Sequence, residues 1–300
     1  MVTSFRFRRL VFLVAVLVVA AVPATYADHS WGSYHWARTA NPFTLKVHDN
    51  LTSVWEPYLA EADVDWDQSS VLDLNVLWNS PLSSVRRCSS TSGRIEICNA
   101  KYGKTGWLGI AGISASGSHI TKGYTKLNDT YFNTSTYNAP AWRRMVTCQE
   151  IGHDFGLDHQ DETFGNVNLG SCMDYTDDPD GGSGGASNND PSNEHPNAHD
   201  YEQIETIYAH LDSTTTISAV FDLMAQSASR PQSLGEILAD AGQWGTPVRY
   251  DAQGRPTVFV MPLGVNHEGE LEADITHVTW APIDPFEGDS RKPERPEPWQ

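Results

Sequence analysis

Hydrophobic and polar residues alternate in two short segments of the N-terminal half, which predicts strands at Phe43–Val47 and Val71–Val76. Between them, Trp55–Ala62 carries apolar residues at helical spacing. A strand, a helix and a second strand in this order favour a parallel pair joined by a crossover helix. Two further strands are predicted at Trp107–Ile113 and Ile120–Leu127, on either side of a small polar turn.

Helical spacing returns twice after these strands. Asn138-Ala139-Pro140 predicts the start of a helix that runs to Gly156, because proline is tolerated in the first turn, where its missing N–H costs little. Residues 177–197 are rich in Gly, Asn, Asp, Ser and Pro and predict a loop. The pattern from Ala198 to Leu211 then predicts a last helix.

The composition changes after residue 212. We expect a short helix at 234–241, strands around Val248 and Val258, and another strand at Ile275–Trp280. Residues 285–300 are charged and rich in proline, which predicts a disordered tail.

The first residues are typical of an export signal. Arg6, Arg8 and Arg9 precede an apolar stretch, Leu10–Val22, and small residues up to Ala27 form a cleavage site. An apolar stretch this short predicts a removed signal peptide at 1–27 and no membrane anchor. We therefore expect a secreted, extracellular chain that starts near Asp28 and has no membrane partner after cleavage.

Charge and cysteine content narrow the possible partners and the compartment. A net charge of −18 argues against nucleic acid, because phosphates would be repelled. Four cysteines in an exported chain predict two disulfides, with three possible pairings. Cys88 and Cys98 bracket a short polar stretch typical of a hairpin end, which favours their pairing and leaves Cys148 with Cys172.

The segment from Cys148 to His159 carries the candidate chemistry. Gln149 and His153 lie one helical turn apart on the same face, so both side chains can reach one ion. Glu150 lies beside that face, where it can reach a metal-bound water without ligating the metal. Gly156 can take a left-handed conformation that ends the helix and returns His159 to the same point. Three ligands leave a fourth position for water, as catalytic zinc requires.

This segment resembles the motif of the metzincin zinc metalloproteases, His-Glu-x-x-His-x-x-Gly-x-x-His followed by a methionine turn. The chain matches at Glu150, His153, Gly156 and His159, and Ser171-Cys172-Met173-Asp174-Tyr175 resembles the methionine turn. The resemblance covers about residues 43–211 and is closest to the matrixin branch. It implies an α+β fold with a twisted mixed, mostly parallel sheet, an active-site helix, the methionine turn and a C-terminal helix.

The resemblance and the change in composition after residue 212 together give a domain plan. We expect a metzincin-like catalytic domain at 28–212, a small β-rich C-terminal extension of unknown role at 213–284, and the tail at 285–300. Pairing of Cys148 with Cys172 would clamp the active-site helix to the methionine turn.

The function implied by the resemblance is that of a secreted, monomeric zinc endopeptidase that acts on protein or peptide substrates. Glu150 would be the general base that activates water, and Tyr175 would approach the metal and the oxyanion. Gln149, His153 and His159 would hold Zn²⁺, with Met173 beneath the metal.

Gln149 departs from the family, which has a histidine at that position. Three outcomes stay open: Gln149 ligates through its amide oxygen, another histidine or a carboxylate completes the site, or the protein is a catalytically impaired, protease-like binding protein. Acidic residues around the motif make Ca²⁺ a second candidate ion, and a calcium-dependent extracellular surface protein is a further alternative. His195, His199 and His210 flank the last helix and are candidate spare ligands, although capping and surface roles are commoner for such histidines.

Overall fold

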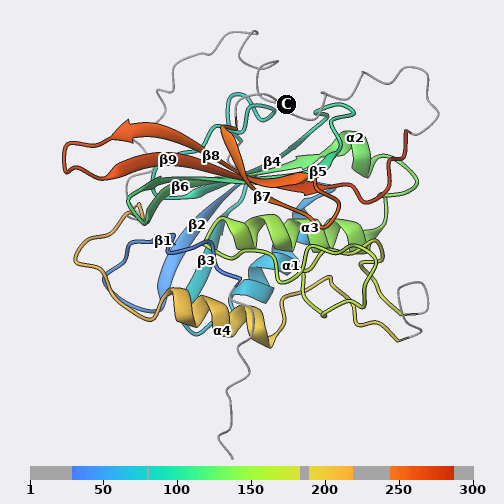
Figure 1. Ribbon diagram of the computed structural model, residues 1–300, viewed down its shortest axis with the longest axis horizontal. Coiled ribbons are helices and arrows are strands. Elements are labelled where there is room, and N and C mark those ends of the chain that lie inside the picture. Colours follow the sequence, from blue (N-terminus) through green and yellow to red (C-terminus); the bar gives the residue numbers. More distant parts are fainter. Residues whose placement is uncertain (1–28, 80, 183–188, 219–243, 287–300) are drawn as a thin grey trace, which may run out of the picture.

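The computed structural model describes residues 29–79, 81–182, 189–218 and 244–286, which form an α+β fold (Figure 1). The predicted signal peptide, the predicted helix at 234–241 and all but the first two residues of the predicted tail lie outside the described residues. Within them, nine strands form one mixed sheet in the order β3-β2-β4-β6-β5-β9-β8-β7, and β1 pairs with β6. The strands are β1 (His35–Trp36), β2 (Phe43–Asn50), β3 (Leu72–Leu77), β4 (Ile95–Ala100), β5 (Trp107–Ser116), β6 (His119–Asn128), β7 (Thr246–Tyr250), β8 (Pro256–Val265) and β9 (Leu271–Trp280).

Helices α1 and α3 lie on one face of the sheet, and α4 lies beyond them (Figure 1). The helices are α1 (Glu56–Trp66), α2 (Asp129–Phe132), α3 (Pro140–His153) and α4 (Ala198–Ile207). Among the described residues, every helix is too short or too polar to cross a bilayer.

The predicted crossover unit at the start of the chain is confirmed. β2 and β3 are parallel with α1 between them, and Phe43 is paired with Leu72. The helical spacing of the sequence buries Leu59, Ala62 and Trp66 on the inner side of α1.

The prediction of a mostly parallel sheet is wrong. The sheet is mixed and mostly antiparallel, because β5 runs antiparallel to both β6 and β9, and β7, β8 and β9 continue the same pattern. The short β5–β6 and β8–β9 connections explain this, since tight turns join antiparallel strands only. The C-terminal strands thus extend the main sheet at β5 instead of forming a sheet of their own.

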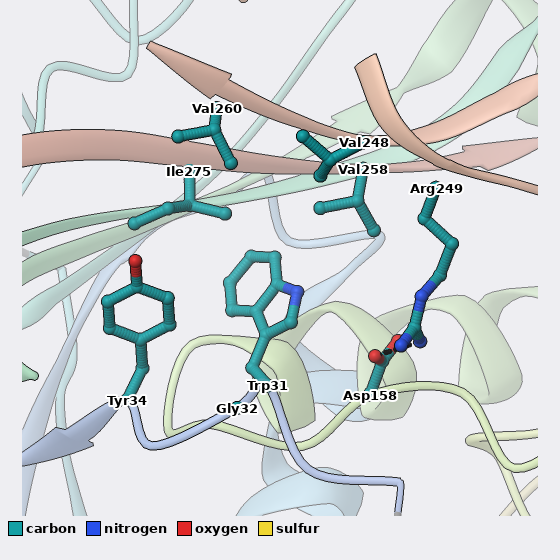
Figure 2. Close-up of a pocket in the computed structure, with 9 residues that line it drawn as sticks. All are labelled: Trp31, Gly32, Tyr34, Asp158, Val248, Arg249, Val258, Val260 and Ile275. Atoms are coloured by element: carbon teal, nitrogen blue, oxygen red, sulfur yellow. Dashed lines mark hydrogen bonds and ion pairs between the residues drawn. The ribbon is translucent and has the colours of Figure 1, made fainter. Parts of the chain in front are cut away.

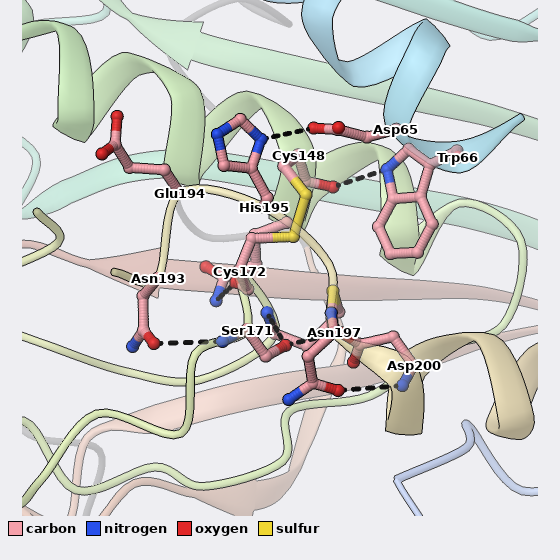
Figure 3. The surroundings of a disulfide bond; sticks show 12 residues. Asp65, Trp66, Cys148, Ser171, Cys172, Asn193, Glu194, His195, Asn197 and Asp200 are labelled. Carbon is pink, nitrogen blue, oxygen red and sulfur yellow. Dashed lines mark hydrogen bonds and ion pairs between the residues drawn. A yellow bond between two sulfur atoms is a disulfide. The ribbon is translucent and has the colours of Figure 1, made fainter. Parts of the chain in front are cut away.

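Both predicted disulfides are present, with Cα–Cα distances of 5.8 Å for Cys88–Cys98 and 6.0 Å for Cys148–Cys172. The second joins α3 to the segment that carries Met173 (Figure 3). Around it, the Ser171 hydroxyl donates to Asp200 at 2.7 Å, so the same segment is also bound to the first turn of α4. Two disulfides are consistent with an extracellular protein.

The helix predicted to start at Pro140 ends slightly earlier than predicted. α3 ends at His153, and Gly156 follows with φ +105°, in the region that favours glycine. A Cβ on Gly156 would lie 2.5 Å from the carbonyl oxygen of Tyr34, so the N-terminal segment also requires glycine here. α4 begins at Ala198 as predicted, with Asn197 and Asp200 forming a capping box, and ends at Ile207.

Candidate metal centre

The last turns of α3 place the predicted site residues against the sheet. Gln149, Glu150 and His153 are all fully buried. The closest approach is to β5, where a Cβ on Gly109 would lie 2.3 Å from Glu150 Oε1. A glycine at this position of β5 is therefore what lets the Glu150 carboxyl group fit between helix and strand.

His153 and His159 are brought together as the motif predicts. Their Nε2 atoms are 2.9 Å apart. The Nδ1 atom of His153 lies 2.8 Å from the carbonyl oxygen of Leu157, and that of His159 lies 3.1 Å from Glu162 Oε1. These acceptors assign the ring proton to Nδ1 in both histidines and leave two Nε2 lone pairs that face each other, an arrangement typical of metal-binding histidines.

A third histidine, His277 of β9, completes the group. Its ring is stacked on that of His153, with centroids 3.9 Å apart and an interplanar angle of 19°. One ligand atom from each of His153, His159 and His277 lies within 4.8 Å of the others. We refer to these three residues as the inner cluster.

The nitrogen atoms of the inner cluster fit a metal ion. His277 is fully buried, and neither of its ring nitrogens has a hydrogen-bond partner within the described residues. Burial lowers the pKa of His153 and of His277 well below the usual value, so both rings are neutral. Three histidines with ligand atoms within 4.8 Å of one another suit zinc, which prefers nitrogen and sulfur ligands.

Gln149 is held by other contacts. Its Nε2 atom donates to the carbonyl oxygen of Cys172 at 2.8 Å, and its Oε1 atom accepts from the Thr279 hydroxyl at 2.8 Å. Both ends of the amide are thus hydrogen-bonded to protein groups. The sequence left three outcomes open for Gln149, one of which was that another histidine completes the site. The structure places such a histidine, His277, beside His153 and His159.

Met173 and Tyr175 both lie beside the inner cluster. Met173 is buried under α3, where its sulfur would lie 2.7 Å from a Cβ on Gly152. The Tyr175 ring is 4.3 Å from the His159 ring, and its hydroxyl donates to the carbonyl oxygen of Val278 at 3.2 Å. Burial raises the pKa of Tyr175 well above its usual value, so the phenol keeps its proton.

The Glu150 carboxyl group is not held in place by hydrogen bonds from the described residues. Neither of its oxygens has a hydrogen-bond partner among the residues that the structure describes. Burial raises its pKa well above the ordinary value, the nearby Thr279 hydroxyl opposes this rise, and the charge of Asp154 adds to it. Since an uncompensated buried carboxyl group is costly to a fold, this group is a candidate for chemistry.

Three consecutive residues of β9 contact the predicted site. His277 joins the histidines, the Val278 carbonyl accepts from Tyr175, and the Thr279 hydroxyl donates to Gln149. β9 is held there by antiparallel pairing with β5, in which His277 is opposite Ala111. The consequence is that every side chain of the inner cluster is shielded from water by the C-terminal strand.

The N-terminal segment covers the cluster from another side. The Trp31 ring is 3.7 Å from the His277 ring, measured between centroids. Trp31 also lines a pocket of about 220 Å³ between this segment and β7–β9, with Val258 and Ile275 on its apolar wall (Figure 2). An ion pair between Arg249 and the buried carboxylate of Asp158 lies at its edge (Figure 2).

Three acidic residues around the motif, Asp154, Asp158 and Glu162, contact protein groups, and two of them, Asp158 and Glu162, lie against His159. Asp154 accepts from the Thr125 hydroxyl at 2.8 Å, Asp158 pairs with Arg249, and Glu162 contacts His159. Ca²⁺ stays a prediction that rests on the sequence.

Sequence reasoning missed His277. The available signal was a polar residue on the buried face of a predicted strand, where Ala273, Ile275, His277 and Thr279 alternate. A single histidine in a strand, far along the chain from the motif, does not identify its partners. No protein-family model, curated protein or solved structure matches this chain.

Proposed function

We propose that this protein is a secreted zinc-dependent endopeptidase with a metzincin-like core, held in a closed form by its own strand β9. The observation that carries the proposal is the Glu150 carboxyl group, fully buried and without a hydrogen-bond partner among the described residues, on the same helix as His153 of the three-histidine inner cluster. The motif around Glu150, His153 and His159 and the following methionine-containing segment support the same function.

In the closed form, His153, His159 and His277 hold the zinc ion. When bound, zinc supplies Lewis-acid chemistry that polarises a peptide carbonyl and makes water more acidic. Glu150 accepts the proton of the attacking water and then passes it to the leaving amine.

Opening requires β9 to leave β5. This movement would remove His277 and release the Gln149 oxygen from Thr279, so that Gln149, His153 and His159 would be the residues that hold the metal. It also releases the Tyr175 hydroxyl from Val278, which makes that hydroxyl available to the oxyanion of the reacting peptide. The exposed backbone of β5 then offers an extended substrate the pairing that β9 had.

A second candidate function is a non-catalytic, protease-like binding protein with a permanently closed metal centre. The observation in its favour is that the Gln149 amide is satisfied at both ends while all three histidines are at most 5% exposed. In that case zinc would have a structural role only.

The test is zinc content together with peptide hydrolysis, measured on the parent and on Glu150→Gln. The substitution keeps the size of the side chain, so we expect zinc to be retained and hydrolysis to fall by about 10²- to 10⁴-fold, the usual contribution of a general base. Glu202→Gln, on the exposed side of α4, is the matched control and should behave as the parent does.

Zinc in the parent with no hydrolysis that depends on Glu150 would leave the second candidate function in place. Absence of bound zinc in all three proteins would overturn both candidates.

A further inference from the structure

We propose a second zinc site, formed by His35, His119, His210 and Asp212, which we call the outer cluster. None of these residues belongs to the inner cluster or to the motif on α3. His35 lies on β1, His119 begins β6, and the other two follow α4. Three separate parts of the chain therefore meet at this point.

The distances in the outer cluster suit one tetrahedral ion. The Asp212 Oδ1 atom lies 3.4 Å from His35 Nε2, 3.3 Å from His119 Nε2 and 3.6 Å from His210 Nε2. The Nε2 atoms of His35 and His210 are 3.1 Å apart. Zinc bonds of 2.0–2.1 Å in a tetrahedron place neighbouring ligand atoms about 3.3 Å apart, which agrees with all four separations.

The surrounding contacts aim the ligand atoms inward. Asp212 Oδ2 accepts from the backbone N–H of Arg38 at 3.1 Å and from its guanidinium group at 3.0 Å, which leaves Oδ1 facing the histidines. The Nδ1 atom of His35 donates to the carbonyl oxygen of Ser33 at 2.7 Å, so its Nε2 atom presents a lone pair. Orientation of ligands by such outer contacts is a regular feature of protein metal sites.

Hydrogen bonding alone does not account for this arrangement. With its proton on Nδ1, His35 Nε2 is an acceptor, yet it faces the acceptor Asp212 Oδ1. Three imidazoles also converge on that one oxygen, which has only two lone pairs to offer. A divalent cation gives all four atoms a common partner, and zinc suits a set of three nitrogens and one oxygen.

The outer cluster has the features of a structural site. All four tetrahedral positions are filled by protein, which leaves no place for a reacting water. The side chain of His210 is 53% exposed and that of His119 is 31% exposed, so an ion can enter from solvent. The bound ion would tie the N-terminal segment to the start of β6 and to the chain after α4.

The experiment measures zinc per chain in the purified full-length protein and the shift of its unfolding temperature on adding zinc after chelation. The parent should hold one more zinc ion than a His119→Ala/His210→Ala double variant, whose two replaced side chains are partly exposed. The matched control is His267→Ala, whose side chain is 90% exposed and outside both clusters, and it should keep the zinc content of the parent.

A second variant guards against a folding defect in the first. Asp212→Asn keeps the shape of the side chain and should bind zinc at the outer cluster at least about 10-fold more weakly. Cobalt substitution adds an independent signal, since tetrahedral Co²⁺ has a characteristic visible absorption that these variants should reduce. The inference is overturned if both variants keep the zinc content, the cobalt spectrum and the thermal response of the parent. Hydrolysis that depends on Glu150 is a separate measurement, so this inference and the proposed function can fail independently.

Discussion

The inner and outer clusters use the same kind of side chain but differ in the position of the carboxylate. In the inner cluster, three buried histidines lie together, and Glu150, one turn before His153 on α3, is buried without a hydrogen-bond partner among the described residues. In the outer cluster, the carboxylate of Asp212 is one of the converging groups and is held there by Arg38. A carboxylate inside the ring of ligands completes a metal site, whereas one beside the ring is available as a base.

The two clusters also differ in how they are closed. β9 covers the inner cluster through contacts that can be lost together when one strand leaves β5. The outer cluster is open to solvent on the side of His210, but protein atoms occupy all its ligand positions. A movement of the chain could reverse the burial of the inner cluster, whereas a zinc ion held by all four groups of the outer cluster would have no position left for a reacting water.

The largest expected effect comes from locking β9 in place. Ser114 and Asp274 are opposite each other in the β5–β9 pairing, so Ser114→Cys/Asp274→Cys can crosslink the two strands. The oxidised variant should lose about 10²- to 10⁴-fold of the hydrolysis rate, because substrate no longer reaches the general base. A mild reductant should restore it, with the parent under the same reductant as control. Equal rates in the parent and the oxidised variant would show that β9 need not move.

Removal of the disulfide next to the motif should affect the inner cluster and the outer cluster differently. Cys148→Ser/Cys172→Ser opens a crosslink with a sequence separation of 24 and should lower the free energy of unfolding by about 3 kcal/mol. It should also weaken zinc at the inner cluster, because α3 and the Met173 segment are no longer joined. Urea unfolding and zinc titration measure both effects. Cys88→Ser/Cys98→Ser should destabilise the fold slightly less and leave zinc binding unchanged at both clusters.

The role of Gln149 can be tested by replacing His277. In the closed form, His277→Ala should weaken zinc at the inner cluster by about 10-fold or more, an effect typical of disturbed metal surroundings. Gln149→His supplies an imidazole from α3. In that background His277→Ala should therefore weaken zinc binding much less. Zinc titration of the four proteins gives the coupling directly. Equal losses in both backgrounds would mean that residue 149 and His277 do not compete for one position.

The smallest effect concerns a carboxylate that faces neither cluster. Burial, and then the charges of Asp67 and Asp73, raises the pKa of Asp63 to about 6 from an ordinary 3.8. The folded state therefore binds this proton more tightly than the unfolded state, so stability is lost as the pH rises from about 4 to 6. Asp63→Asn removes that loss and should stabilise the protein by roughly 1 kcal/mol at pH 7.5, after allowance for solvent screening.

The measurement is urea unfolding of parent and variant between pH 4.5 and 7.5. The gain should shrink steadily toward the acidic end, whereas Glu202→Gln should give a constant difference from the parent. A gain for Asp63→Asn that is independent of pH would point to helix propensity as its cause.

The sequence by itself determined the parts of the molecule that depend on local spacing. The periodicities of 2 and 3.6 residues located β2, α1 and β3, and the four-residue and three-residue steps of the motif brought His153 and His159 together around Gly156. The two disulfides followed from the spacing of four cysteines. Each of these features is specified by residues that lie close to one another along the chain.

The tertiary structure alone decided how the two clusters are completed. Thr279 and Gln149 are 130 residues apart in sequence, and Asp212 and His35 are 177 apart, so no local pattern connects them. The packing of whole sheet faces against α3 decides which strand pairs with β5 and in which register. A shift of one residue in that register would turn His277 away from the motif. The motif thus placed two histidines and a buried carboxyl group, while sheet pairing selected the third histidine and covered the group.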